Sequence, residues 1–235
     1  MNKESAKIRG IEVHPFRSPD DLIDYIDVRR GMLVAVNAEK TMNADDHLRS
    51  LINANTGYCD GAGAVLALKR KGLKDCVRIP GCELWLKIID RFHSTKTFYL
   101  VGSKPEVIEE TVGLLKKKYP DIKVVGYRDG FLSDQAQRQA LLDDIGSKKP
   151  DVVFVAMGSP RQEFLMEEMI KVNPDAIYQG LGGSFDVFSG HQARAPRWWQ
   201  DHGLEFAYRF YATPKRITRL GPYLRFALRL FTNRL

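Results

Sequence analysis

The most constraining feature of the sequence is an alternation, over residues 31–183, of short apolar runs with segments of helical periodicity. The apolar runs end in glycine or a small polar residue; they are MLVAVNA (32–38), TFYLVG (97–102), IKVVGY (122–127), DVVFVAMG (151–158) and AIYQGLGG (176–183). Continuous apolar runs of this length are typical of strands buried on both faces of a parallel sheet. The sequence therefore predicts an α/β fold.

Between the runs, six segments have apolar residues at three- and four-residue spacing, as amphipathic helices require. They are 43–53, 62–71, 83–92, 105–119, 134–147 and 161–172. In a βαβ series such helices cover both faces of the sheet. Pro105 and Pro160 suit the first turn of their helices, and Ser133 suits an N-cap.

After residue 183 the pattern changes to aromatic and turn residues and then to a basic tail. Seven of the 36 lysines and arginines lie in residues 206–235, which contain no acidic residue, so the rest of the chain has 29 charges of each sign. We expect a boundary near residues 190–205, between a body (1–195) and a basic C-terminal helical appendage (196–235).

The expected appendage helix is amphipathic. Leu220, Leu224, Leu228 and Phe231 form one apolar stripe, whereas the arginines of this segment at 225 and 229 lie on another face. A basic amphipathic helix of this kind suits a lipid surface. Packing on its own domain or on a partner subunit is the alternative.

Composition argues against several classes of protein, namely membrane-spanning, secreted, disulfide-bonded and nucleic-acid-binding proteins. No apolar run reaches the ~20 residues of a membrane-spanning helix, mean hydropathy is −0.30, and MNKESAKIRG has no apolar signal segment, so we expect a cytoplasmic protein. Cys59, Cys76 and Cys82 form no CxxC pair, which indicates reduced structural thiols. The neutral body and the lack of a recognition motif argue against nucleic acid as a partner.

Three glycine-containing loops follow apolar runs: VGSKPE (101–106), MGSPRQE (157–163) and LGGSFD (181–186). In parallel sheets, ligands bind beyond the carboxyl ends of the strands, where glycine lets the backbone approach a phosphate. One such glycine is usually only a turn, but three on successive strands predict an anionic, nucleotide-like ligand. Neither GxGxxG nor GxxxxGK[ST] occurs, so dinucleotide cofactors and ATPase chemistry have no specific support.

The sequence contains no DxD pair and no HExxH, so we expect no metal site and no cofactor. Arginines must then balance any bound diphosphate. Asn37, with Glu39 and Lys40, ends the first run, and Asp60 lies at the next turn in YCDGAGAV. Asp60 suits either a helix cap before Gly61 or a general base in a cleft.

These segments together resemble the WecG/TagA/CpsF family of bacterial glycosyltransferases over almost the whole chain. The motifs that carry the resemblance are VAVNAEK, YCDGAGAV, RIPGCELW, FYLVGSKPEVIEE, VVGYRDGF, VFVAMGSPRQE, GLGGSFDVFSGHQARAPRWWQ and GLEFAYRF with its P-x-R-x-x-R continuation. The variants VAVNAEK and RIPGCELW are most like the WecG branch. That branch adds N-acetyl-D-mannosaminuronic acid to undecaprenyl-diphosphate-linked N-acetylglucosamine in enterobacterial common antigen assembly.

The resemblance implies an inverting, metal-independent transferase with a Rossmann-like body and an appendage that meets the inner membrane. It implies a UDP-sugar donor, a polyprenyl-diphosphate-linked acceptor and peripheral attachment to the inner-membrane surface. It does not decide between a monomer and a homo-oligomer. The implied catalytic residues are Asp60 as the base, Asn37, Arg78 and Gln162. The implied substrate-binding residues are Gly102, Gly158, Ser159, Gly182, Gly183, Asp186, Arg209, Arg216 and Arg219. Cys59 stands where the family more often has proline.

Two other functions agree with the same residues. One is transfer of N-acetylmannosamine from UDP, as in the teichoic-acid branch of the family. The other is a UDP-binding module without catalysis that its tail recruits to membranes. For the uronate carboxylate of the first donor, either Arg78 or Arg161 could supply the cation.

Overall fold

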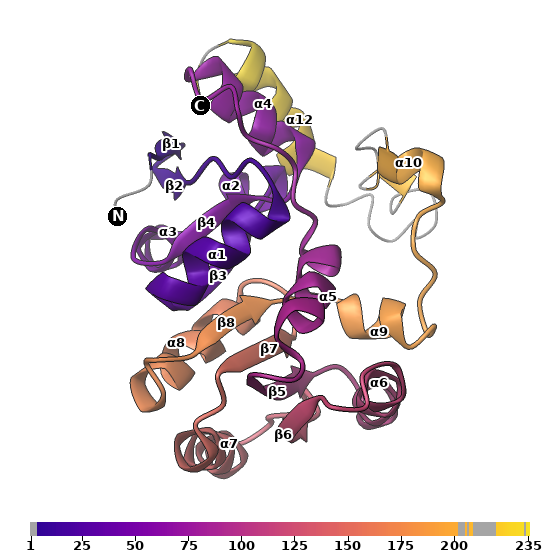
Figure 1. Cartoon of the computed structure of the whole chain (residues 1–235). Helices are drawn as coiled ribbons and strands as arrows, with labels where there is room; N and C mark the ends of the chain where they lie inside the picture. The colour runs from indigo at the N-terminus through magenta and orange to yellow at the C-terminus, as the bar shows by residue number, and fades with distance from the viewer. Residues whose placement is uncertain (1–3, 202–204, 206, 209–219, 233) are drawn as a thin grey trace.

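A six-stranded parallel sheet with the strand order β4-β3-β8-β7-β5-β6 forms the centre of the computed structural model (Figure 1). Its strands are β3 (Gly31–Val36), β4 (Thr56–Cys59), β5 (Thr97–Gly102), β6 (Lys123–Arg128), β7 (Val152–Ala156) and β8 (Ile177–Gly180). The structure describes the whole chain except residues 1–3, 202–204, 206, 209–219 and 233. The α/β prediction is confirmed, and all five predicted strands are present.

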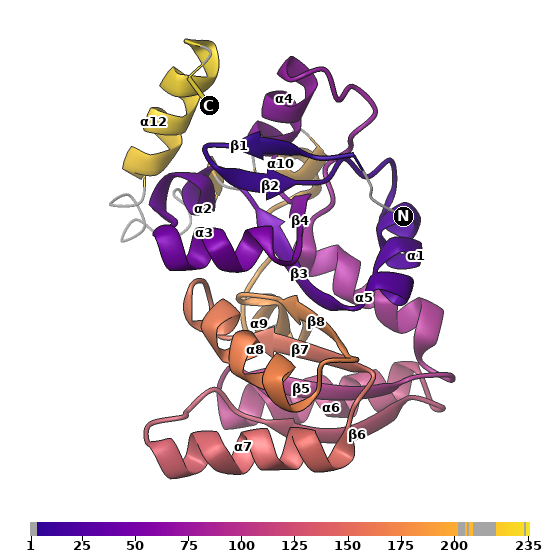
Figure 2. The same ribbon diagram turned by 90° about the vertical axis from the view of Figure 1, so that its left-hand side faces the viewer.

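Helices cover both faces of the sheet, each with its own apolar core (Figure 2). One face carries α2 (Ala38–Asn43), α3 (Asp46–Asn53), α4 (Ala62–Arg70), α7 (Gln135–Lys148) and α8 (Arg161–Val172). The other carries α1 (Pro19–Arg29), α5 (Gly81–Phe92), α6 (Pro105–Lys118) and α9 (Ser184–Phe188). The remaining described helices are α10 (Arg197–Asp201) and α12 (Leu220–Phe231).

The sequence prediction missed the N-terminal elements and one strand. β1 (Ala6–Ile8) and β2 (Ile11–Val13) form an antiparallel hairpin that precedes α1. β4 is a four-residue strand, TGYC, where the sequence predicts no strand. Its pairing with β3, in which Cys59 lies opposite Val36, places Asp60 directly at the edge of the sheet.

Three predicted helix starts need correction. The segment 43–53 is not one helix, because the side chains of Asn37 and Asp45 each cap a separate helix, α2 and α3. The N-cap of α7 is Asp134 rather than Ser133, since its carboxylate accepts the amide hydrogen of residue 137. Pro105 begins α6 as predicted, whereas Pro160 precedes the first residue of α8.

β6 differs from the other predicted strands because it is not buried on both faces. It is an edge strand with no fully buried residue. Gly126 on β6 lies against the ring of Tyr99, so a Cβ atom there would come within 2.3 Å of Tyr99 Cε2. The sheet therefore ends at β6, and only glycine fits at position 126 of this strand.

The C-terminal helix α12 packs on α2 and α4 of the body. Phe226 and Leu230 are buried in the same core as the sheet, and Phe226 covers Gly63 so closely that a Cβ atom there would lie 2.8 Å from Cε1 of the ring. Of the predicted apolar stripe, Leu224, Leu228 and Phe231 are 62%, 66% and 74% exposed, whereas Leu220 is half-buried. Leu220, Leu224 and Phe231 border the cavity described below, and Leu228 does not. The limits of an appendage at 196–235 stay a prediction.

Candidate active site

A cavity of ≈ 670 Å³ opens at the carboxyl ends of β3, β4 and β8. β3 and β8 are neighbours although they are far apart in sequence, and such a reversal of strand order is where open α/β sheets bind ligands. Seven predicted site residues line the cavity: Asn37, Asp60, Arg78, Ser159, Gln162, Gly182 and Gly183. Gly102, Gly158 and Asp186 are not in its lining, and Arg209, Arg216 and Arg219 lie outside the described residues.

Two hydrogen bonds hold the Asp60 carboxylate at the cavity wall. Its Oδ1 accepts the amide hydrogen of Gly81, the first residue of α5, at 2.9 Å, and its Oδ2 accepts from Asn37 Nδ2 at 3.4 Å. The helix that follows it, α4, begins after Gly61 with no side-chain cap. Asp60 therefore does not cap its own helix, and its carboxylate faces the cavity between two neighbouring strand ends.

Asn37 connects this carboxylate to α2. Its Oδ1 accepts the backbone amide hydrogen of Lys40 at 3.0 Å as the N-cap of the helix. Because that contact fixes which end of the side-chain amide faces the helix, Nδ2 is directed at Asp60. The N-cap thus orients a donor toward the candidate base.

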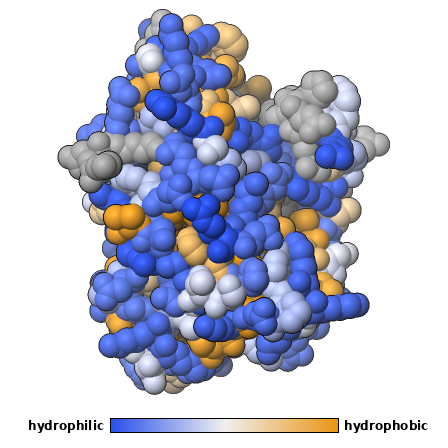
Figure 3. Space-filling view, viewed as in Figure 1, coloured by the Kyte–Doolittle hydropathy of each residue, from blue (hydrophilic) through white to orange (hydrophobic). Residues whose placement is uncertain are grey.

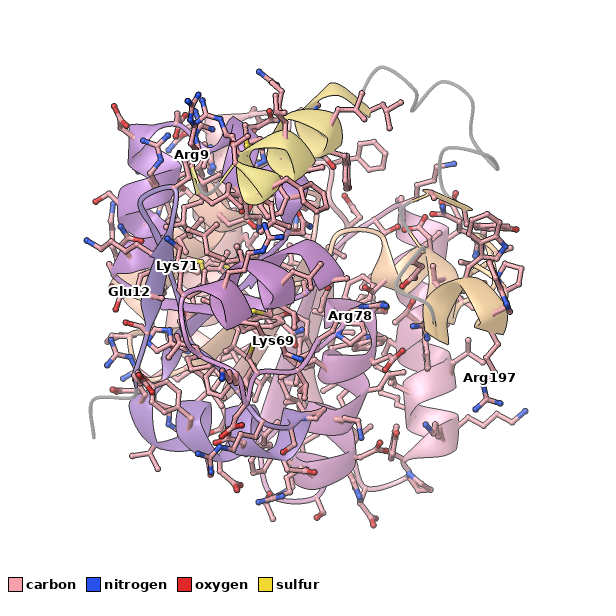
Figure 4. All side chains as sticks on the ribbon, turned by 90° about the horizontal axis from the view of Figure 1, so that it is seen from above. Arg9, Glu12, Lys69, Lys71, Arg78 and Arg197 are labelled. Atoms are coloured by element: carbon pink, nitrogen blue, oxygen red, sulfur yellow. The ribbon has the colours of Figure 1, made fainter. Side chains whose placement is uncertain are left out.

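Arg78 lies beside Asp60 and contacts Glu205, which lies 127 positions further along the chain. Its Nε donates to the carbonyl oxygen of Asp60 at 3.3 Å, and its Nη2 donates to Glu205 Oε2 at 2.8 Å. The other oxygen of Glu205 lies 3.6 Å from Arg194 Nε. Seen from above, Arg78 lies on the side of the body that faces α10 (Figure 4).

Arg194 is a further cation of the cavity wall that we did not single out from the sequence. Its guanidinium donates to Glu83 on α5. Burial by itself lowers the pKa of Arg194, but the Glu83 hydrogen bond and the nearby Cys82 and Glu205 raise it above its ordinary value. The pair joins residues 111 positions apart, so no local pattern could have indicated it.

Gln162 joins two of the glycine loops. It is buried, and its Oε1 accepts the amide hydrogens of Gly158 at 3.1 Å and Gly182 at 2.9 Å. Gly180 makes room for it, since a Cβ atom at that position would lie 2.2 Å from Gln162 Nε2. These two loop amides therefore bind a side chain of the protein, and the glutamine fixes the distance between the loops.

Gly102 and Asp186, which are not in the cavity lining, make other contacts. The hydroxyl of Ser103 donates to Asp186 Oδ2 at 2.9 Å. Gly102 has φ +127°, and a Cβ atom there would lie 2.3 Å from the carbonyl oxygen of Ala156 on the neighbouring strand. Its glycine is thus required by the close approach of β5 and β7.

The cysteine thiols near this site are protonated and unreactive at neutral pH. All three cysteines are free, and burial raises the pKa of the Cys59 thiol and raises that of Cys82 to about 11. Within the described residues, no group of three or more His, Cys, Asp or Glu side chains could hold a metal ion. No helix among them is long and apolar enough to span a bilayer.

Comparison with known families assigns the chain. Residues 6–235 match the glycosyl transferase WecG/TagA/CpsF family. The match includes both the strand ends that carry Asn37 and Asp60 and the C-terminal segment with α12. The chain belongs to the WecG/TagA/CpsF family of glycosyltransferases.

Proposed function

We propose that this transferase moves N-acetyl-D-mannosaminuronic acid from UDP to undecaprenyl-diphosphate-linked N-acetylglucosamine, with inversion and without a metal ion, in enterobacterial common antigen assembly. The observation that carries the proposal is the Asp60 carboxylate, which the Gly81 amide and Asn37 hold at the wall of a cavity at the strand ends. The WecG-type motifs around it support the choice of donor and acceptor.

Asp60 acts as the general base. A sugar hydroxyl has a pKa far above 7, so a carboxylate must take its proton while the oxygen bonds to the anomeric carbon. The new bond forms on the face opposite UDP, the bond to UDP breaks, and the configuration at the anomeric carbon inverts. The Gly81 amide and Asn37 keep the accepting oxygens directed into the cavity.

Cations must stabilise the UDP that leaves, since negative charge develops on its diphosphate. Arg78 and Arg194 line the cavity, and both are held by carboxylates of the protein. Arg209 and the other tail arginines at 216 and 219 are further candidates, and Gly102, Gly158 and Asp186 stay candidates for nucleotide contact. For the donor carboxylate, Arg78 is favoured over Arg161, which is exposed and donates to the Met157 carbonyl oxygen.

The C-terminal helix provides the contact with the inner membrane. Leu224, Leu228 and Phe231 are exposed on α12, and apolar atoms gather at the end of the molecule where this helix lies (Figure 3). Burial lowers the pKa of Arg9, and the positive charges of Arg229, Arg49 and Arg225 lower it further. Exposed apolar side chains on a helix that also carries Arg225 and Arg229 suit an anionic lipid surface.

The decisive experiment is a transfer assay with purified protein, lipid-linked N-acetylglucosamine and either UDP-N-acetylmannosaminuronic acid or UDP-N-acetylmannosamine. We expect product from the first donor, with turnover unchanged by EDTA. Product from the second donor alone would support the teichoic-acid type of reaction instead. UDP binding without transfer from either donor would support the non-catalytic module, and loss of activity in EDTA with recovery in Mg²⁺ would contradict the metal-independent mechanism.

A further inference from the structure

A buried ion pair joins α2 and α8 beside the cavity. Lys40 Nζ on α2 lies 2.6 Å from Glu163 Oε1 on α8, and the two side chains are only 6% and 1% exposed. Removing two charges from water carries a large desolvation cost, so a buried ion pair is weak evidence for a role in stability. Its contacts with neighbouring residues indicate another role.

Glu163 controls which way the Gln162 amide points. Glu163 Oε1 accepts a hydrogen bond from Gln162 Nε2 at 3.2 Å, in addition to the one from Lys40. A carboxylate can only accept, so it requires the NH₂ end of the glutamine amide on its side. The oxygen end must then face the other way, where it accepts the amide hydrogens of Gly158 and Gly182.

Lys40 keeps this arrangement in one state. Burial by itself raises the pKa of Glu163. The charge of Lys40 and the hydrogen bonds from Lys40, Ser159 and Gln162 outweigh burial and bring this pKa below its ordinary value. Glu163 is therefore an acceptor at neutral pH. A neutral carboxylic acid would carry a hydrogen to donate, and it would no longer exclude the reversed orientation of Gln162.

The same lysine reaches the candidate base through its backbone. Its amide hydrogen bonds to Asn37 Oδ1, and Asn37 Nδ2 donates to Asp60. A continuous hydrogen-bonded series therefore runs from Asp60 through Asn37, Lys40, Glu163 and Gln162 to the two glycine loops. The side chain of Lys40 serves the loop end of the series, and its backbone serves the Asp60 end.

We propose that Lys40 and Glu163 are positioning residues for donor binding, because they hold the Gln162 amide in the one orientation that ties the Gly158 and Gly182 loops together. The identity of the donor rests on the proposed function, whereas the state of the loops does not. The inference predicts that a hydrogen-bond acceptor at 163 matters to the loops, and that the same volume without an acceptor does not suffice.

Two double variants separate positioning from packing. Lys40→Met with Glu163→Met replaces the pair by apolar side chains, a change that folded proteins often tolerate, and it removes the acceptor for Gln162 Nε2. Lys40→Met with Glu163→Gln also removes both charges but keeps an oxygen that can accept. The matched control is Arg138→Met with Glu168→Met, which removes an ion pair of 2.8 Å between α7 and α8, away from the cavity lining.

We expect amide hydrogen exchange at Gly158 and Gly182 to accelerate in Lys40→Met/Glu163→Met, and to stay closer to the unmodified protein in Lys40→Met/Glu163→Gln. In calorimetry, the Kd for UDP should rise about 10- to 100-fold in the first variant, as misplacement of binding loops implies. It should rise less in the second, whose amide at 163 can accept from Gln162 but can also donate. The donor KM should rise with it, whereas kcat should change less because the backbone of residue 40 still binds Asn37. The control should change none of these values.

Unchanged exchange at both glycines in a folded Lys40→Met/Glu163→Met protein would overturn the proposal. Equal losses in the two double variants would also overturn it, because they would show that packing alone matters. If Lys40→Met/Glu163→Met does not fold, the double variant Lys40→Met with Glu163→Leu makes the same test. If the unmodified protein fails to bind UDP, the proposed function is wrong, and the exchange rates still decide whether the pair positions the loops.

Discussion

The Asp60 carboxylate accepts from one backbone amide and one side-chain amide. An asparagine at this position keeps one oxygen, which can still accept from Gly81, whereas its NH₂ group cannot accept from Asn37. We expect Asp60→Asn to lower turnover by about 10²- to 10⁴-fold, the usual contribution of a general base, because an amide cannot take the proton of the acceptor. The Kd for UDP should stay nearly constant. Steady-state kinetics and calorimetry check both, with Asp75→Asn on the exposed surface as the control. Near-normal turnover of Asp60→Asn would remove Asp60 from this role.

Single residues of the site were predictable where their position in the sequence, directly after a predicted strand, places them at the edge of the sheet. Asn37 and Asp60 follow strands, and Gln162 lies in the first turn of the helix after a strand, so the parallel sheet brings them to one edge. The contacts of Lys40 and Arg78 with carboxylates were not predictable, because their partners lie 123 and 127 positions away. No spacing rule connects residues that meet only after the sheet has formed.

At the scale of elements, strands that lie within long apolar runs were predictable, including the four-residue β8, whereas strands without such a run were not. β5 (Thr97–Gly102) matches its predicted run residue for residue. β4 contains four residues, one of them glycine, and its strand conformation depends on the pairing with β3 rather than on its own propensity. The same holds for the three-residue strands β1 and β2.

Asp151 ties two strands together, and it makes stability depend on pH. Its Oδ2 accepts from the backbone N–H and the hydroxyl of Thr97, at 2.8 and 2.7 Å. Burial by itself raises the pKa of Asp151, but these hydrogen bonds, with Lys96 and Arg30, bring it below the value of the unfolded chain. A depressed pKa contributes stability that is present above the unfolded pKa and is lost as the pH falls through the folded pKa.

Asp151→Asn should therefore lower the free energy of unfolding at pH 7 and lower it less at acid pH. The variant and the unmodified protein should converge as the pH falls from about 5 toward 2, the range over which a depressed aspartate titrates. Urea unfolding at several pH values measures this. A difference between the two proteins that is the same at every pH would contradict it.

The two faces of α12 should respond differently to substitution. Phe226→Ala removes a ring that is 3% exposed, so it should loosen the helix from α2 and α4 and make it more sensitive to limited proteolysis. Leu228→Ser on the outer face should change the free energy of unfolding by less than about 0.5 kcal/mol. It should instead weaken sedimentation with lipid vesicles. Equal effects of both variants on proteolysis would contradict the assignment of the two faces.

At the scale of the whole molecule, the excess positive charge lies in residues 206–235. Each basic residue near an anionic surface contributes about 1 kcal/mol, within a Debye length of about 8 Å at physiological salt. Binding to phosphatidylglycerol vesicles should therefore weaken steeply as salt rises. Arg225→Glu with Arg229→Glu should impair this binding and leave transfer to a short water-soluble acceptor intact.

Truncation after Glu205 should abolish both vesicle binding and transfer to the soluble acceptor, because it also removes Arg209, Arg216 and Arg219. Transfer and vesicle sedimentation are measured on the same preparations. Full soluble-acceptor turnover by the truncated protein would show that the tail is an anchor alone, and that residues of the body stabilise the leaving group.

The neighbouring position of β3 and β8 also has a consequence for synthesis. β3 ends at residue 36, whereas β8, its partner in the sheet, begins at residue 177. At 5–20 residues per second, the ribosome makes the second strand on the order of ten seconds after the first. During that interval the apolar edge of β3 has no partner from its own chain. While it is still on the ribosome, the nascent chain therefore exposes an unpaired strand edge. That edge needs protection from other chains until β8, the last strand of the sheet, emerges.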